Sequence, residues 1–370
     1  MVRYFFPRLA SFSALAVLAL STSNNALASA CDSVFYSQYQ ACQVSALACA
    51  PYASPEEFIS AHPHCFSGGA SSSQVVVSGS SFQQIGSISS ALFMRLLGNS
   101  GPVQLGSSPA KGMAAGGKNA WNVWGNIGAN DTRQSYTLGG NSIGFDSNIV
   151  NTVFGVDYAL APGMVVGVSG AFDRGDGTSR TNGNPFAATS KGYAVAPYIG
   201  YQISKELALD ATVGIGSGKV YSAGSAESEA DRLFYGVNLG YSSWIKDVQL
   251  TGKLGYQHGE EDFGLTKVSG VTQNNTAVKS KLDRWQLGAQ AGYWLGKGVM
   301  PYASLAYLAD RRTSSRASTD PIGKSAWQWG LGVNFFSLAS GVTGGLGYTQ
   351  EDSRSNQKNE AVMANIGVRF

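Results

Sequence analysis

The chain has 370 residues, with 26 lysines and arginines against 23 aspartates and glutamates, so its formal net charge is +3. This near balance excludes the strongly basic surface on which nucleic-acid binding depends. Glycine is frequent at 47 residues and charged residues make up only 13%, but a hydrophobic content of 44% excludes a disordered chain.

The first 30 residues have the pattern of a secretory signal peptide. Arg3 and Arg8 precede the apolar run 12–20, and the tripeptide ASA at 28–30 supplies the small residues of a cleavage site. An apolar run of that length is too short to span a bilayer. We therefore expect export by the Sec machinery and cleavage after residue 30. A lipoprotein acylated at Cys31 is the alternative.

A short cysteine-bearing segment follows at 31–79. It holds all four cysteines of the chain: Cys31, Cys42, Cys49 and Cys65. An even number of cysteines in an exported segment indicates two disulfides, and three pairings remain open. The stretch SGGASSS at 67–73 has the composition of a flexible linker.

The next segment, 80–118, holds one predicted helix and a loose connector. Between Ser80 and Leu97, large apolar residues recur at spacings of three and four, as on one face of an amphipathic helix. The positions that define this helix are Phe82, Ile85, Ile88, Leu92 and Leu96, with Arg95 near its end.

From residue 119 to 370 the period changes to two. Alternate positions are large and apolar in twelve segments, near 121–130, 150–160, 163–172, 192–202, 206–216, 233–243, 247–258, 283–295, 299–309, 326–336, 341–350 and 360–370. Each segment has about 10 residues, the length of a tilted strand that crosses a bilayer. The positions between the apolar ones are mostly glycine, glutamine, asparagine and threonine. The sequence therefore predicts an all-β fold, a 12-stranded antiparallel transmembrane β-barrel that the amphipathic helix precedes.

The connections between these segments alternate in length. Long polar links occupy 131–149, 173–191, 217–232, 259–282, 310–325 and 351–359, and the other links have two to four residues. Long loops on one side and tight turns on the other are typical of bacterial outer-membrane barrels, as are aromatic residues at both ends of the outward stripes. Pro197 falls inside a predicted strand, where it removes a ladder hydrogen bond, so we expect either a bulge there or a strand boundary that differs from the predicted one.

The last strand carries a specific resemblance. Asn365, Ile366, Gly367, Val368 and Phe370 resemble the carboxy-terminal signal of outer-membrane proteins that the barrel-assembly machinery recognises. A helix with ALFMRLLG, then NAWNVWGNIG, then twelve strands ending in NIGVRF is similar, over about residues 80–370, to the translocator domain of autotransporters, the type V secretion family.

This resemblance implies how the chain is placed in a membrane. The helix would thread the barrel lumen, and Asn122, Asn126, Lys253, Gln286 and Gln290 would face the pore. The barrel would be a monomer among outer-membrane lipid and lipopolysaccharide, with its long loops at the cell surface. One departure is plain, because only about 31–79 is available as a passenger, whereas family passengers usually have hundreds of residues.

Three short motifs suggest other chemistry. HPHC at 62–65 could bind a metal, but a zinc site needs four ligands with supporting geometry. His258, followed by Glu260, could act as a general base at the loop-side rim, yet no serine stands at an enzyme-like spacing. The RGD tripeptide at 174–176 resembles an integrin-binding motif in a long connecting segment. We expect no enzyme activity, no metal and no cofactor.

These patterns lead to one interpretation and two alternatives. We expect an outer-membrane autotransporter-type barrel that translocates or displays its short amino-terminal segment at the cell surface. The alternatives are a general outer-membrane pore and a surface adhesin that acts through its loops, neither of which exports a passenger.

Overall fold

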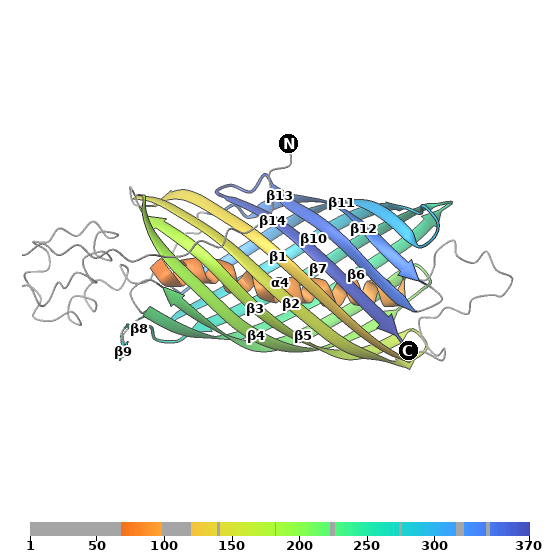
Figure 1. Cartoon of the computed structure of the whole chain (residues 1–370), viewed down its shortest axis with the longest axis horizontal. Coiled ribbons are helices and arrows are strands. Elements are labelled where there is room, and N and C mark those ends of the chain that lie inside the picture. The colour runs from red at the N-terminus through yellow and green to blue at the C-terminus, as the bar shows by residue number, and fades with distance from the viewer. Residues whose placement is uncertain are drawn as a thin grey trace, which may run out of the picture.

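The computed structural model describes residues 68–97, 120–138, 141–181, 183–222, 226–268, 270–273, 276–315, 322–337 and 341–370. The predicted signal peptide, the four cysteines, the HPHC motif and the connector 98–118 lie outside these residues. Within the described part, one helix precedes a run of antiparallel strands (Figure 1).

Twelve strands form a closed barrel, as the sequence predicts. They are β1 (Trp121–Leu138), β2 (Asn141–Ala161), β3 (Met164–Thr181), β4 (Asn184–Gln202), β5 (Leu207–Ser222), β6 (Ala226–Ile245), β7 (Val248–Phe263), β10 (Val278–Tyr293), β11 (Val299–Ser314), β12 (Ser325–Ser337), β13 (Val342–Asp352) and β14 (Gln357–Arg369). Each strand pairs with its neighbours in the chain, and β1 pairs with β14 to complete the ring. A barrel closed in this way leaves no unpaired edge, which a sheet in lipid requires.

Two further strands form a small hairpin outside the ring. β8 (Lys267–Val268) pairs with β9 (Val271–Thr272) and with the beginning of β6. This hairpin lies in the connection between β7 and β10, which is the longest connection at its end of the barrel.

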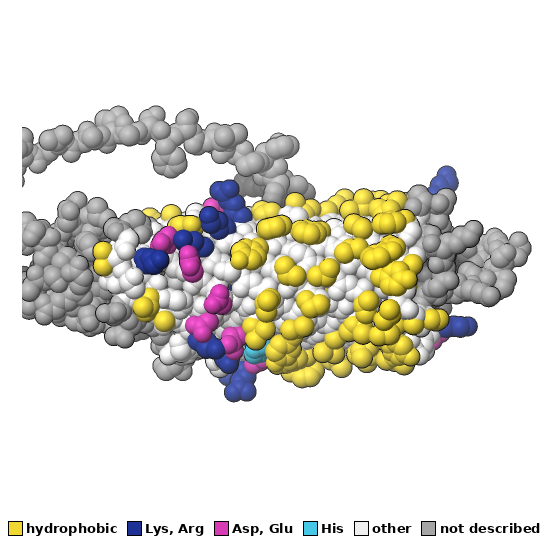
Figure 2. Space-filling model, turned by 90° about the horizontal axis from the view of Figure 1, so that it is seen from below, with side chains coloured by type: hydrophobic (Ala, Val, Ile, Leu, Met, Phe, Trp, Pro, Cys, Tyr) yellow, Lys and Arg dark blue, Asp and Glu magenta, His cyan; other side chains and the backbone are white. Residues whose placement is uncertain are grey.

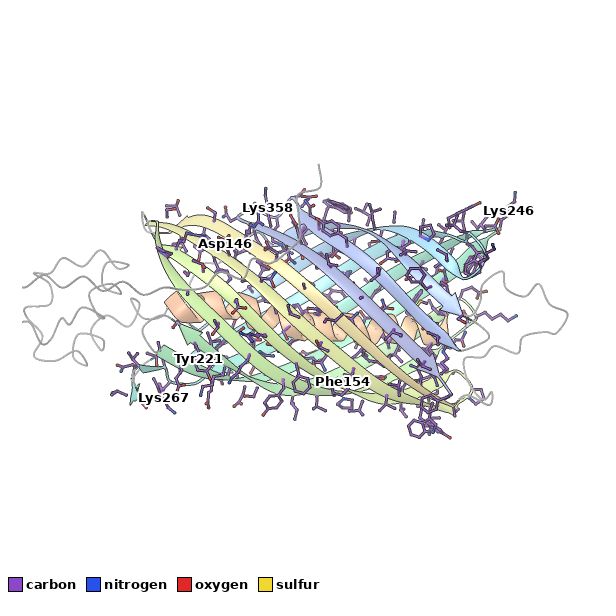
Figure 3. All side chains as sticks on the ribbon, in the orientation of Figure 1. Asp146, Phe154, Tyr221, Lys246, Lys267 and Lys358 are labelled. Carbon is purple, nitrogen blue, oxygen red and sulfur yellow. The ribbon has the colours of Figure 1, made fainter. Side chains whose placement is uncertain are left out.

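The two ends of the barrel differ in their connections. The turn end holds the links after β2, β4, β6, β10 and β12, together with Trp121 and Phe370. The loop end holds the links after β1, β3, β5, β7, β11 and β13. In Figure 3, Lys246 marks the turn end and Lys267 the loop end.

The helix α4 (Gly68–Leu96) runs through the interior of the barrel (Figure 1). It packs against β2–β7 and touches β10. Arg95, near its last turn, contacts Ala120 just before β1, so the carboxy-terminal end of the helix lies at the turn end. Its amino-terminal end therefore points to the loop end. No helix among the described residues is both long and apolar enough to cross a membrane.

The helix begins earlier than the sequence predicts. The stretch 67–73, expected to be a flexible linker, falls almost entirely within the first turns of α4. Glycine and serine have a low helix propensity in an isolated chain. Extending a helix that already exists is easier, because it needs no new nucleation step. The linker prediction is therefore wrong.

The strands are also longer than predicted, and most loops are shorter. β2 has 21 residues and β6 has 20, and only two residues separate β1 from β2. The prediction of long loops at 131–149, 173–191 and 217–232 is wrong, because these stretches are mostly strand. Apolar alternation stops where the lipid stops, but the backbone ladder continues into water, where outward positions can be polar.

The predicted bulge at Pro197 is also wrong. On one side Pro197 stays in register with β3. On the other side, Val195 pairs with Ile215 and Tyr198 with Thr212, so the β4–β5 register is unchanged across a short gap in the ladder. The Thr212 hydroxyl donates to the Pro197 carbonyl at 3.1 Å and restores one lateral contact there.

The outside of the barrel carries a broad apolar belt with a charged band beyond it on the loop side (Figure 2). Exposed aromatic side chains mark both ends of the belt: Phe154, Phe172, Tyr193, Tyr235, Trp285, Tyr307 and Trp327 on the loop side, and Tyr158, Tyr201, Tyr241, Tyr293, Phe335 and Phe370 on the turn side. In the charged band, the ammonium groups of Lys279 and Lys281 lower the pKa of Glu260.

Candidate functional site

The interior surface between helix and barrel is the candidate functional site, and apolar contacts form its base. Ile85, Ile88 and Leu92 are almost fully buried, with relative exposures of 0%, 0% and 1%. Glycines in the wall make room for them, since a Cβ at Gly236 would lie 2.6 Å from Ile85 and one at Gly200 3.0 Å from Leu92. The amphipathic face predicted from the sequence is therefore the face that packs on the wall.

Carboxylates of the wall hold the helix at three heights. At the turn end, Arg95 Nε lies 2.8 Å from Asp157 Oδ1, and both side chains are almost fully buried. Asn122 Nδ2 donates to the other oxygen of Asp157 at 2.9 Å. Arg369, on β14, donates to the Met94 carbonyl at 2.9 Å and so joins the last strand to the end of the helix.

The second contact lies six residues from Arg95 along α4, in the direction of the loop end. Ser89 Oγ donates to Asp210 Oδ2 at 2.9 Å, and Asn238 Nδ2 donates to Asp210 Oδ1 at 2.8 Å. Ser89, Asp210 and Asn238 are all buried. Ser89 thus donates to an oxygen of Asp210 that would otherwise accept a hydrogen bond from water.

The third contact lies towards the loop end. Ser80 Oγ donates to Asp173 Oδ1 at 2.8 Å. Arg232 binds the same carboxylate with two nitrogens, one of them Nη2 at 3.1 Å from Oδ2. Asn151 Nδ2 donates to the Ser80 carbonyl at 3.0 Å. Glu261, the register partner of Arg232 on β7, is also buried.

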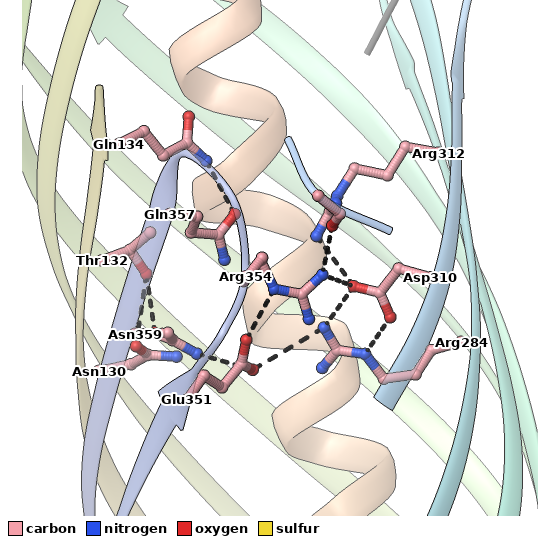
Figure 4. A network of polar contacts seen from close by, with 11 residues as sticks. Asn130, Thr132, Gln134, Arg284, Asp310, Arg312, Glu351, Arg354, Gln357 and Asn359 are labelled. Carbon is pink, nitrogen blue, oxygen red and sulfur yellow. Dashed lines mark hydrogen bonds and ion pairs between the residues drawn. The ribbon is translucent and has the colours of Figure 1, made fainter. Parts of the chain in front are cut away.

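A fourth polar group crosses the opposite wall at the loop end (Figure 4). Arg284 donates to both oxygens of Asp310, at 2.7 and 2.8 Å. Arg354 Nη1 lies 2.9 Å from the same carboxylate, and its Nε donates to Glu351 at 3.0 Å. Arg312 Nη2 lies 2.9 Å from Asp310. We call these five residues the arginine–carboxylate network.

This network is joined to both the helix and the barrel seam. The Arg284 guanidinium lies 5.4 Å from the centre of the Phe82 ring on α4. At the other side, Asn359 donates to Glu351 at 3.3 Å and accepts from Thr132 at 3.0 Å. Side chains therefore connect the helix to β1 across the lumen at this height.

The residues predicted to face the pore lie on the inner wall. Asn122 and Asn126 are buried inside β1, and Lys253 lies on β7 near Asp210. Gln286 and Gln290 alternate with the outward Trp285 and Leu287 on β10. The predicted helix positions Phe82, Ile85, Ile88, Leu92, Arg95 and Leu96 are all buried on α4. The residues of the proposed assembly signal lie on β14, except Phe370, which follows its last residue.

Two of the alternative motifs, His258 and the RGD tripeptide, lie on the outside of the barrel. His258 stacks on Tyr235, with ring centres 4.7 Å apart, and its Nδ1 lies 2.7 Å from Asp283. The RGD tripeptide is part of β3 and pairs on both sides, so its predicted place in a connecting loop is wrong. Among the described residues, no group of three or more histidines, cysteines or acidic residues is placed to hold a metal.

Sequence reasoning missed the wall carboxylates and the arginine–carboxylate network. A usable signal was present for part of the first group, because Asp157 and Asp210 are charged residues at inward positions of predicted strands, whereas Asp173 follows the end of one. For Glu351 and Arg354 no such signal exists, because Arg354 lies in the connection between β13 and β14, and its partner Asp310 is 44 positions away.

A protein-family model and several solved structures of autotransporter domains are similar to this chain. A protein-family model described as the autotransporter β-domain matches residues 123–349. The translocator domain of the autotransporter NalP from Neisseria meningitidis superposes with a TM-score of 0.54 at 13% identity, over 68% of this chain and 89% of that one. The β-domain of the Bordetella autotransporter BrkA gives a TM-score of 0.54 at 17% identity, over 68% and 100%.

The transport unit of the autotransporter AIDA-I from Escherichia coli is similar as well. Its TM-score is 0.51 at 13% identity, over 77% of this chain and 97% of that one. At these identities the solved structures establish the shared fold. No curated protein matches the chain.

Proposed function

The chain belongs to the autotransporter family, as the match over residues 123–349 shows, and from this premise we propose that its barrel exports residues 31–79 and displays them at the cell surface. The β-domain of this family forms an outer-membrane barrel for passenger translocation. The proposal concerns the identity of the passenger, which would be the segment 31–79.

The direction of α4 carries the proposal. The helix ends beside Ala120 and Asp157 at the turn end, and it runs from there through the lumen towards the loop end. Whatever precedes Gly68 in the chain therefore leaves the lumen at the loop end. If that end faces the outside of the cell, the part of the segment 31–79 that precedes α4 lies outside too.

The wall contacts support a helix that stays in place after export. Asp157, Asp210 and Asp173 each hold a helix side chain, and all three are buried. Withdrawal of the helix would leave the buried Asp157 without its charged partner Arg95, and Asp173 and Asp210 each without a hydrogen-bond donor, so it is unfavourable. The segment would then remain attached to the cell rather than be released.

The surrounding machinery is proposed on the same basis. The Sec machinery would export the chain, and the barrel-assembly machinery would recognise Asn365, Ile366, Gly367, Val368 and Phe370. The barrel would be a monomer in contact with outer-membrane lipid and lipopolysaccharide. We propose that it acts without catalysis, and that His258 serves as an interfacial side chain paired with Asp283.

The test is the accessibility of an epitope tag placed after Asp32. Intact cells and cells with a permeabilised outer membrane are compared for antibody binding and protease cleavage. A tag after Lys246, in the turn between β6 and β7, is the matched control for the opposite end.

We expect the Asp32 tag to be reached on intact cells and the Lys246 tag only after permeabilisation. If the Asp32 tag behaves like the Lys246 tag, the segment stays in the periplasm and the proposal is refuted.

A further inference from the structure

Two cationic side chains face one another on the outer surface of the barrel. Arg174 on β3 and Lys191 on β4 are directly opposite in the strand register, and both are exposed. Lys191 is in turn opposite Lys219 on β5, so three cations follow one another across three strands. Like charges that stand directly opposite one another destabilise a sheet. An anion bound between members of this row would relieve their repulsion.

Acidic side chains neutralise one end of this row. Lys219 forms ion pairs with Glu227 at 3.2 Å and with Glu229 at 3.1 Å. Within the described ranges of the chain, no ion pair joins Arg174 or Lys191 to an acidic residue. We call Arg174 and Lys191 the cation pair.

The neighbours of the cation pair on the side away from the apolar belt leave its charge in place. Asp176, the next outward residue of β3 and one that the structure describes, forms no ion pair with either cation. The Lys191 ammonium lies 5.5 Å from the centre of the Tyr221 ring, a contact that attracts a cation without neutralising it. The pair therefore keeps its positive charge at the surface.

On the membrane side the cation pair borders an apolar surface. The next outward residues are Phe172 on β3 and Tyr193 on β4, which face one another and have relative exposures of 59% and 57%. Phe154 on β2 stacks on Phe172, with ring centres 6.0 Å apart. A Cβ at Gly170 would lie 2.7 Å from the Phe154 ring, so glycine lets this ring lie close against the wall. Outward neighbours on a strand are about 7 Å apart, so the cations lie where the charged band of Figure 2 begins.

A second pair of opposed cations on the loop side differs in this respect. Arg133 on β1 and Lys358 on β14 are also directly opposite one another and exposed. Asp131 and Glu360, themselves opposite, lie between them and the apolar part of their strands, and Asp131 pairs with Arg133 at 3.1 Å. An acidic row therefore separates these cations from the belt, whereas the cation pair borders the belt directly.

We propose that the cation pair binds a phosphate of lipopolysaccharide in the outer leaflet, while acyl chains of the same lipid lie on Phe154, Phe172 and Tyr193. A phosphomonoester carries about −1.5 to −2 charges near neutral pH, which two cations match. An arginine also binds phosphate oxygens through two parallel hydrogen bonds. The phosphates of lipopolysaccharide stand directly above its acyl chains, in the same order as the cations and the aromatic rings of this surface.

The inference rests on the proposed function, because only a loop end that faces the outside of the cell meets lipopolysaccharide. It assigns particular residues to that contact. A lipid held at this place would fix the height and the rotation of the barrel in the outer leaflet.

The test titrates purified deep-rough lipopolysaccharide into the full chain in detergent and follows the complex by native mass spectrometry. We expect a one-lipid complex for the wild-type protein, and an apparent Kd about tenfold higher for Arg174→Gln with Lys191→Gln, which removes two charge-assisted contacts. Arg133→Gln with Lys358→Gln removes the same charges from the other opposed pair. This matched control should leave the Kd nearly unchanged.

Three further ligands identify the group that is bound. Lipopolysaccharide without its lipid A phosphates should bind the wild-type protein as weakly as the intact lipid binds the Arg174→Gln, Lys191→Gln variant. Inorganic phosphate and phosphatidylglycerol, at the same concentration as the intact lipid, should not displace it. Folding of both double variants is checked by heat-modifiable migration, and the three ligands test the wild-type protein whether or not a variant assembles.

The proposal is overturned if the wild-type protein forms no one-lipid complex, or if the two double variants bind alike. It is equally overturned if removal of the phosphates leaves the Kd unchanged, or if inorganic phosphate or phosphatidylglycerol displaces the intact lipid. Binding in detergent does not depend on the orientation of the barrel in a cell, so its failure is distinct from a failure of the epitope test.

Discussion

At the scale of single residues, the helix is held by a few buried polar contacts on top of an apolar face. The Arg95–Asp157 pair is the most buried ion pair between helix and barrel, with side-chain exposures of 4% and 1%. Such a pair adds little stability relative to an apolar contact of the same shape, but the loss of one partner leaves the other charge buried and alone. Its main effect is therefore to fix the position of the helix.

Replacing Asp157 by Asn tests how much the folded state depends on the Arg95–Asp157 pair. We expect a loss of about 3–5 kcal/mol in the free energy of unfolding, because Arg95 would stay buried without a counter-charge. Equilibrium unfolding in urea, with the protein in lipid vesicles, measures it.

The matched control is Asp146→Asn. Asp146 pairs with Arg180 on the outer surface, where both side chains are nearly half exposed, so its loss should cost below about 1 kcal/mol. Equal effects of the two substitutions would contradict a positioning role for Asp157.

At the scale of elements, the tight turns constrain the backbone. In the turn between β6 and β7, Lys246 has φ of 55°, in the left-handed region that favours glycine. A side chain in this region costs roughly 1–2 kcal/mol, whereas glycine adopts it freely. Glycine at position 246 would therefore make this turn more stable than the lysine that is present.

Lys246→Gly should stabilise the barrel by about 0.5–1 kcal/mol, since the relief of strain exceeds the added entropy of the unfolded chain. The urea midpoint reports this gain. Lys205→Gly, in the turn between β4 and β5, serves as the control: Lys205 has no positive φ, so glycine there should destabilise slightly. A lower midpoint for Lys246→Gly would show that the turn is not strained.

Elements are also where sequence and structure can be compared in physical terms. The alternation of Trp327, Trp329 and Leu331 with glycine and glutamine predicts a strand in lipid, and β12 is that strand. Lipid requires apolar side chains on the outward face of a strand. The part of a strand that lipid covers can therefore be recognised in the sequence. The extension of β2 back to Asn141 was not readable, because water accepts any polar residue on the outer face there.

The interior was partly predictable for the same reason. Alternation puts Gln286 on one face of its strand, and the family resemblance implies that Asn122 and Gln286 face the lumen. The stagger of the strands around the barrel decides which inward side chains contact one another. This stagger cannot be read from the sequence of any single strand. The contact between Asp173 and Ser80, 93 positions apart, and that between Arg354 and Asp310 therefore required the structure.

At the scale of the whole molecule, β14 completes the ring. It pairs with β13 on one side and with β1 on the other, and through Arg369 it touches the end of the helix. Phe370 follows it with a relative exposure of 61%, so it contributes little to packing within the protein. A strong effect of this residue would therefore reflect recognition during assembly.

Phe370→Ala should lower the amount of heat-modifiable barrel in outer membranes severalfold, while the protein that does assemble should unfold at an almost unchanged urea concentration. Phe335→Ala removes another outward aromatic of the turn side, with 43% exposure, and should leave assembly nearly unchanged. If both variants assemble equally, or if Phe370→Ala acts by destabilising the folded barrel, the terminal residue is not an assembly signal.

The length of the strands sets the height of the barrel mouth. A strand as long as the 21 residues of β2, at about 3.3 Å per residue and a tilt near 45°, rises roughly 49 Å, whereas the apolar band of such barrels is about 25 Å tall. Most of the excess lies at the loop end, as a collar of about 20 Å beyond the apolar band, of which the headgroup layer covers roughly 5–7 Å. A segment that leaves through this collar begins its path in open water, so even a very short passenger needs no stalk to clear the membrane.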